Sequence, residues 1–410
     1  RNSADHTSSS PSYAYETRKL SSATMSSSEC DAKKALLPKL AISEISLGRL
    51  LGQGGFSVVC KIDAIELQEV FDTSDEDAKL RADFSSSMTN NQYVMKTLRT
   101  DLPEEEYTKG IIDLAIEADF LAVLAHENII SMKALANSDP HESKFFVVLD
   151  RLVVTLDRKF NHWRKVVGEN IGFWFGPFGY CCAKQAPLHK IWLERIQAAR
   201  DIANAMYYLH SNAIVYRDLK PDNIGFDTHG QLKVFDFGLA KRLNPADKGE
   251  DGLFLMTGNT GSLRYMAPEV ARGEPYDQRV DAYSFGILFW QICSLQTPYA
   301  GFSTKAHAEQ VVQQGHRPKP DRTWPQSWIT QMMSCWSQDF QQRPDFDEIA
   351  VYLDEQVEEL YNNEGEVPSR TSEIRAKNKK KNGNNARLDV DTRLSTADDA
   401  NTRRFEKDVV

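Results

Sequence analysis

Residues 215–223 carry side chains suited to chemistry on a hydroxyl group. Asp218 and Asn223 stand there in an R-D-x-x-x-x-N arrangement, and a D-F-G tripeptide begins downstream at Asp236. The Asp218 carboxylate can accept a hydroxyl proton, whereas the Asn223 amide oxygen suits a hard cation. A given tripeptide occurs by chance in roughly one chain of this length in twenty, but R-D-L-K-P-x-N just upstream of D-F-G is not expected by chance.

A glycine-rich stretch, L-G-Q-G-G-F-S-V-V at residues 51–59, lies between two predicted strands. Glycines allow a tight turn whose backbone N–H groups can approach phosphates without side-chain obstruction. Taken alone, the stretch is weak evidence and favours a plain hairpin turn. A dinucleotide-binding turn is excluded because a strand, rather than a helix, follows it.

Lys96 and Glu117 form a second candidate pair. Lys96 lies within a short predicted strand, and Glu117 lies beside the apolar stripe of a predicted helix. A strand lysine could simply be solvated. However, an unpaired glutamate near an apolar stripe is costly, so Lys96 is its natural partner.

The order of these motifs resembles one family. M-A-P-E at residues 266–269 follows D-F-G, and the ordered set G-x-G, Lys96, Glu117, R-D-L-K-P-D-N, D-F-G and A-P-E is similar to that of the eukaryotic protein kinase superfamily over about residues 45–355. Lys220 matches the serine/threonine type. Cys335-Trp336 with Arg343-Pro344 resembles the tyrosine-kinase-like branch. The resemblance implies transfer of the γ-phosphate of Mg-ATP to serine or threonine hydroxyls of proteins in signalling.

The resemblance also implies roles for individual residues. Lys96, paired with Glu117, would hold phosphates, Asp218 would deprotonate the substrate hydroxyl, and Lys220 would contact the γ-phosphate. Asn223 and Asp236 would bind Mg²⁺. The remaining nucleotide contacts would come from the glycine loop, the adenine pocket and the hinge between the lobes, namely Gly52, Gly54, Gly55, Val59, Val94, Asp150 and Leu152.

Other matches concern support and control. Glu269 would pair with Arg343, and Asp281 would brace the catalytic loop. Arg217 suggests control by an upstream kinase through a phosphate on the segment after D-F-G. Thr257 and Thr260 are the candidate acceptors, although both could be ordinary loop residues. Ser262 would line the substrate channel.

Three departures from the family pattern are Ser57 for a loop glycine, Val94 for a small alanine and Tyr216 for histidine. None removes a charged group that the chemistry needs. A pseudokinase, which binds nucleotide or partners without turnover, would usually lack Lys96, Asp218 or Asp236. A small-molecule kinase on a related fold is the second alternative, and it would generally lack the A-P-E, Asp281 and Arg343 matches.

The periodicity predicts the elements that must position these residues. Strands are expected at 45–51, 57–65, 93–98 and 145–149, and residues 101–104 have the form of a capping box opening a helix. Beyond residue 151 the pattern is helical, so an α+β, bilobal fold is expected, with a small β-rich N-lobe (45–150) carrying one long helix and a larger helical C-lobe (151–360). Residues 67–91 are predicted to be an inserted loop and 161–187 a second insertion.

Composition sets further bounds on the 410-residue chain. Residues 1–44 and 361–410 are expected to be disordered, the first rich in serine and the second polar with a basic run. The net charge of -9 disfavours nucleic acid as a partner, and no segment is apolar enough to span a bilayer. The six scattered cysteines suggest reduced thiols in the cytoplasm or nucleus. A monomer or transient dimer is expected.

Overall fold

The computed structural model describes residues 32–68, 74–87, 92–140, 142, 144–171, 185–363 and 365–369. Its N-terminal part is a six-stranded sheet in the order β1-β5-β6-β4-β3-β2. The strands are β1 (Lys39–Leu40), β2 (Ile45–Gln53), β3 (Ser57–Ile65), β4 (Tyr93–Leu98), β5 (Met132–Ala136) and β6 (Phe146–Asp150). The four strands predicted in this region are confirmed.

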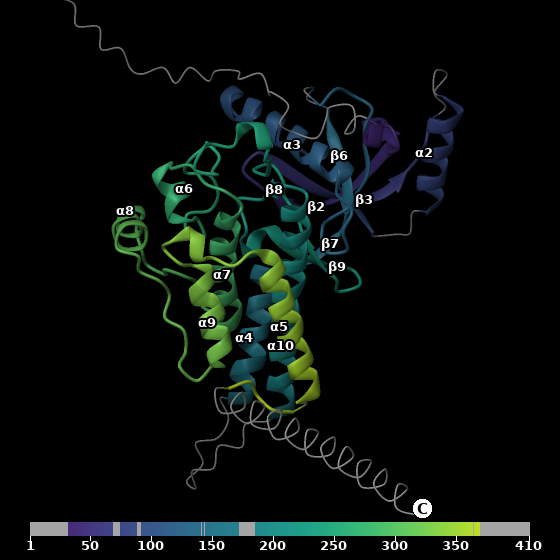
Figure 1. Ribbon diagram of the computed structural model, residues 1–410. Coiled ribbons are helices and arrows are strands. Elements are labelled where there is room, and N and C mark those ends of the chain that lie inside the picture. Colours follow the sequence, from purple (N-terminus) through teal and green to yellow (C-terminus); the bar gives the residue numbers. More distant parts are fainter. Residues whose placement is uncertain are drawn as a thin grey trace, which may run out of the picture.

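One long helix, α3 (Glu104–Val123), packs against this sheet (Figure 1). Its buried face includes Leu114, Ala118 and Leu121, whose spacing is that of an amphipathic helix. The predicted capping box does not form, because the helix begins after Pro103 without a side-chain cap and Asp101 instead binds Arg99.

The C-terminal part is mainly helical, as expected (Figure 1). Buried side chains of its long helices, among them Ile202, Met206 and Phe285, form a continuous core. The helices are α4 (Leu156–Ile171), α5 (Gln185–Ser211), α6 (Pro268–Arg272), α7 (Arg279–Ser294), α8 (Thr304–Ala306), α9 (Gln326–Cys335) and α10 (Phe346–Asn362), with a π-helical turn, η4 (His307–Gln313), after α8. The predicted α+β kinase fold is therefore confirmed.

Short strands form two further, smaller sheets. β7 (Leu152–Thr155), β9 (Ile224–Asp227) and β10 (Leu232–Val234) form one sheet, and β8 (Ile214–Val215) pairs with β11 (Lys241–Arg242). The segment between β8 and β9 contains Asp218 and Asn223, and Asp236 lies two residues after the end of β10. These strands therefore fix both ends of the segments with the candidate chemistry.

Two sequence predictions for the N-terminal part are wrong. Residues 32–44 were expected to be disordered, but β1 pairs in parallel with β5, and Leu40 and Glu44 are buried. The segment 67–91 was expected to be a loop, but it contains helix α2 (Asp75–Ser87). Arg81 of α2 forms a buried ion pair with Glu44, and Phe84 packs on Tyr93 at 5.4 Å between ring centroids. These distant contacts order a segment whose own composition favours a loop.

The second predicted insertion is also smaller than expected. Residues 161–171 continue α4 and residues 185–187 belong to α5, whereas 172–184 lie outside the described residues. Trp163 is fully buried, packs on Phe160 and donates its Nε1–H to Glu194 at 3.1 Å. Trp163 thus anchors α4 in the C-lobe core, whereas most of its neighbours on this part of the helix are exposed or half-buried. None of the described helices is long and apolar enough to cross a membrane.

Candidate active site

The cleft brings a lysine from the sheet against a glutamate from α3. Lys96 Nζ lies 2.5 Å from Glu117 Oε2 and 3.3 Å from Asp236 Oδ1. Burial opposes the charge on Lys96, but the carboxylates of Glu117 and Asp236 outweigh it and hold the Lys96 pKa above its usual value. Lys96 is therefore a fixed cation at the wall of the cleft.

The candidate catalytic base is held by two neighbours in its own loop. Lys220 Nζ lies 2.6 Å from Asp218 Oδ2, and Asn223 Nδ2 donates to the same oxygen at 2.9 Å. The other carboxylate oxygen, Oδ1, is buried without a hydrogen-bond partner among the described residues. Because an unmet buried acceptor is costly, this oxygen is suited to a substrate hydroxyl or water.

A buried aspartate positions the loop that carries Asp218. Asp281, at the start of α7, is fully buried and accepts the backbone N–H groups of Tyr216 and Arg217, both at 2.8 Å. Arg217 has a left-handed φ of 70°, as does Asp236 at 68°. Such conformations persist only where surrounding contacts hold them. Asp281 supplies those contacts for the loop.

Tyr216 stands where the family pattern has a histidine, and it holds the catalytic loop through its own contacts. Its ring is fully buried and meets Phe237 edge-on at 5.3 Å between centroids, and its hydroxyl donates to the carbonyl oxygen of Phe235. The tyrosine therefore ties the catalytic loop directly to the segment that precedes Asp236.

A cavity of about 260 Å³ joins these groups. Gly54, Gly55, Lys96, Glu117, Asp218 and Asp236 all line it. The predicted adenine and hinge residues are not part of its lining. Val94 is buried in β4, Asp150 ends β6 and Leu152 begins β7. Gly52 and Val59 pair between β2 and β3, and the turn is closed by a Gly54 N–H bond to the Ser57 carbonyl at 2.8 Å.

Asp113 is a cleft residue that the sequence did not single out. It lies one turn before Glu117 on α3, lines the cavity and touches the backbone near Gly238, where an added Cβ would come within 3.2 Å of the Asp113 Cβ. Burial and the nearby charge of Asp236 raise its pKa to about 6. The i, i+4 spacing to Glu117 was the available signal.

The segment after D-F-G contacts Arg217. Arg217 Nη1 lies 3.0 Å from Thr257 Oγ1, and Thr260 Oγ1 lies 3.0 Å from the same oxygen. Gly261 has φ 95°, and a Cβ there would come within 2.2 Å of the Arg217 carbonyl oxygen. Glycine at this position therefore allows the segment to approach the catalytic loop.

Ser262 and the A-P-E glutamate lie further along that segment. Ser262 lines a larger cavity together with Lys220. Glu269 forms a two-pronged ion pair with buried Arg343, at 2.5 and 2.9 Å. Ser262 thus lines an open cavity, whereas both carboxylate oxygens of Glu269 are already paired with Arg343.

The donor atoms near Asp236 fit magnesium better than a softer metal. An Asp236 carboxylate and an Asn223 amide are hard oxygen ligands, and the unpartnered Asp218 Oδ1 lies in the same cleft as Asp236. Among the described residues no cluster of three or more His, Cys, Asp or Glu could form an all-protein metal cage. Magnesium needs none, because it is usually held by one or two carboxylates together with substrate phosphates and water.

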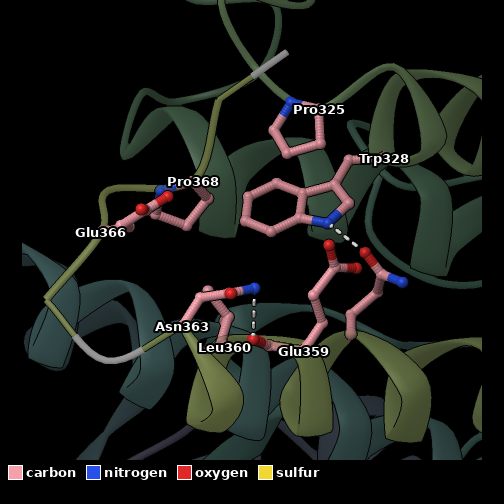
Figure 2. Close-up of a pocket in the computed structure, with 8 residues that line it drawn as sticks. Pro325, Trp328, Glu359, Leu360, Asn363, Glu366 and Pro368 are labelled. Carbon is pink, nitrogen blue, oxygen red and sulfur yellow. Dashed lines mark hydrogen bonds between the residues drawn. The ribbon is translucent and has the colours of Figure 1, made fainter. Parts of the chain in front are cut away.

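A separate small hollow lies between α9 and α10 (Figure 2). Trp328 forms one wall, with its Nε1–H bound to Gln356 at 2.8 Å, and Asn363 donates to the Glu359 carbonyl at 2.9 Å. It shares no residue with the cleft. The polar atoms named here are already paired, so the hollow has no evident chemical role.

Comparisons with known proteins agree with this geometry. Residues 45–353 match the family model described as protein tyrosine and serine/threonine kinase. The serine/threonine-protein kinases STY17 and STY46 of Arabidopsis thaliana are each 39% identical to the chain, over 171 and 178 residues. These matches cover 41% and 43% of this chain and 28% and 29% of the relatives.

A third relative has a broader name. The serine/threonine/tyrosine-protein kinase HT1 of the same plant is 32% identical over 159 residues, which is 39% of each chain. The matched stretches therefore span well under half of these relatives. The family model, by contrast, covers most of the chain, and its match confirms the family inferred from the motifs. The chain belongs to the protein tyrosine and serine/threonine kinase family.

Proposed function

We propose that the chain is an active kinase that transfers the γ-phosphate of Mg-ATP to serine or threonine hydroxyls of proteins. The observation that carries this proposal is the convergence of Lys96, Asp218 and Asp236 on one cavity. Phosphoryl transfer requires mainly positioning and charge neutralisation, and these three side chains offer a fixed cation, a base and a metal ligand.

Each side chain has one task in this scheme. Lys96, held by Glu117, binds phosphate oxygens, and the glycine turn offers backbone N–H groups above them. Asp218 orients the substrate hydroxyl and accepts its proton through Oδ1, while Lys220 approaches the transferred phosphate. Magnesium, bound by Asn223 and Asp236 together with phosphate oxygens, would supply charge neutralisation.

Turnover and residue type can be tested together. The purified chain is incubated with Mg-ATP carrying a labelled γ-phosphate and a peptide array, and the phosphorylated residue is identified. We expect label on serine and threonine that disappears in Asp218→Asn. Label on tyrosine alone would reject the serine/threonine assignment.

A pseudokinase is the second candidate, and the retained Lys96, Asp218 and Asp236 argue against it. If wild-type protein binds ATP and magnesium but transfers no label to any peptide, the pseudokinase is the better description. A small-molecule kinase is disfavoured by the Glu269–Arg343 pair and by Asp281, which match the protein-kinase pattern.

We further propose that Thr257 or Thr260 accepts a regulatory phosphate. The Thr257 hydroxyl contacts Arg217, and the Thr260 hydroxyl contacts Thr257. The Arg217 guanidinium also donates to the Leu239 carbonyl at 2.6 Å and so links Thr257 to the segment after Asp236. A phosphate here would strengthen that link through charge-assisted hydrogen bonds. We expect Thr257→Ala/Thr260→Ala to lower activity about tenfold or more. Unchanged activity of the double variant, measured on protein treated with an upstream kinase mixture, would exclude this role.

A further inference from the structure

The larger cavity beside the catalytic loop contains an unusual buried histidine. The cavity measures about 560 Å³, and Lys220, Ser262, Arg264 and His307 are among its lining residues. His307, at the start of η4, is only 2% exposed, and neither ring nitrogen has a hydrogen-bond partner among the described residues. Two unmet polar atoms on one buried ring are uncommon and call for a partner that enters the cavity.

The cations around His307 differ in how they are engaged. Burial lowers the His307 pKa, and the charges of Arg317 and Arg264 lower it further, so the free protein carries a neutral ring here. Arg317 is occupied, since it bonds the Trp336 carbonyl at 2.9 Å and Gln338 at 2.7 Å. Within the part of the chain that the structure describes, the exposed Arg264 side chain has no hydrogen bond or ion pair. It is the available cation of this wall.

The other charged side chains that line the cavity are one lysine and two aspartates. Lys220 is neutralised by Asp218 at 2.6 Å. Asp157 and Asp222 also line the cavity, are exposed and have no ion pair among the described residues. The cavity is therefore lined by charges of both signs, the carboxylates of Asp157 and Asp222 and the guanidinium of Arg264.

We propose that the protein substrates of this kinase carry an acidic side chain close to the phosphoacceptor, bound by Arg264 and His307. This inference rests on the proposed function, because the groove begins at Lys220 beside the candidate base. A carboxylate would pair with the free guanidinium and accept a hydrogen bond from the imidazole, which satisfies a group that is otherwise buried and unbound. A basic side chain at the same place would be repelled by Arg264.

The test compares charge preference within each enzyme, so that differences in folding or turnover cancel. Peptides with one phosphoacceptor carry Glu, Lys or Ala at each flanking position in turn, and kcat/KM is measured for each. For the wild type we expect one position at which Glu exceeds Lys by about tenfold, as a charge-assisted hydrogen bond predicts. In Arg264→Glu the Glu-to-Lys ratio at that position should invert. Arg322→Glu, an exposed arginine outside the cavity, should keep the wild-type ratio.

A second variant separates binding from support of the fold. His307→Phe keeps a planar ring and removes both nitrogens, so we expect the Glu-to-Lys ratio to fall while the melting temperature stays equal or rises. A lower melting temperature with an unchanged ratio would mean that His307 only supports the groove. An equal Glu-to-Lys ratio at every position in the wild type, or inversion in Arg322→Glu as well, would overturn the proposal.

A binding measurement distinguishes failure of the proposed kinase activity from failure of the proposed site for an acidic side chain. The same peptides with Ala in place of the phosphoacceptor are titrated by fluorescence anisotropy, a measurement that needs no turnover. If no peptide is phosphorylated, the proposed activity is rejected. If the Glu peptides nevertheless bind more tightly than the Lys peptides, and this difference is lost in Arg264→Glu, the site for an acidic side chain is still supported. Equal binding of Glu and Lys peptides would overturn that site whether or not phosphate is transferred.

Discussion

The cleft and the Glu269–Arg343 ion pair both contain buried carboxylates, but they differ in whether all of the carboxylate oxygens have hydrogen-bond partners. Arg343 is 3% exposed, and besides Glu269 it binds the carbonyl oxygens of Ser337 and Arg279, at 3.0 and 3.2 Å. In the cleft, Glu117 and Asp218 each keep one buried carboxylate oxygen without a partner among the described residues. A completed network contributes to stability, whereas an incomplete one leaves atoms for a ligand.

This contrast predicts that substitutions in the two regions separate activity from stability. The largest effect on activity is expected at Asp218. Asp218→Asn removes the proton acceptor, so the rate of phosphate transfer should fall by a factor on the order of 10³. Its melting temperature should stay near that of the wild type, because the amide oxygen of asparagine can accept the bonds that Lys220 and Asn223 donate to Oδ2. Retained turnover, measured with labelled ATP, would contradict the assignment of the base.

The largest effect on stability is expected at Glu269. Glu269→Ala leaves the buried Arg343 charge unpaired, so the free energy of unfolding should fall by about 3–5 kcal/mol. Glu274→Ala is the matched control, since it breaks an exposed pair with Arg272 and should change that free energy by about 0.5 kcal/mol or less. Urea denaturation measures both variants. Equal losses in the two would show that the Glu269 pair is not special.

Asp281 is fully buried and holds the catalytic loop, so its substitution should affect both activity and stability. Asp281→Asn can no longer accept both N–H groups of the catalytic loop without reorientation, so we expect a loss of about 1–3 kcal/mol of stability. Transfer should also slow, by about 10- to 100-fold, as is typical when the support of a ligand residue is removed. Parallel denaturation and rate measurements check this. A loss of only activity or only stability in Asp281→Asn would contradict this double role of Asp281.

The smallest effect is expected at Asp113. Because its folded pKa of about 6 lies above the usual aspartate value, the folded state favours the protonated carboxyl. Ionisation therefore costs stability as pH rises from about 4 to 6. Asp113→Asn should stabilise the chain by about 1 kcal/mol at pH 7, after allowance for solvent at this half-buried group, and by nothing below pH 4. Melting curves across pH test this, and a stabilisation that is the same at pH 4 and pH 7 would refute the shift.

The sequence predicted the family and most elements, because strand and helix periodicity and the ordered motifs are local signals. It missed the order of residues 32–44 and helix α2, whose burial depends on a long-range pair between Glu44 and Arg81. It also missed Asp113 and His307. A lone aspartate or histidine has no motif, and the importance of each arises only from neighbours such as Asp236 and Arg264 that the fold brings close.

The most direct test of the account is ATP binding with and without magnesium. We predict that ATP binds the wild type more tightly when Mg²⁺ is present. Asp236→Asn should lose most of this metal-dependent gain in affinity, about tenfold or more in Kd. Lys96→Ala should weaken binding in both conditions, because its charge contacts phosphate directly. No binding by the folded wild type with magnesium present, or an affinity that neither substitution changes, would contradict the convergence of these residues on one metal-bound triphosphate.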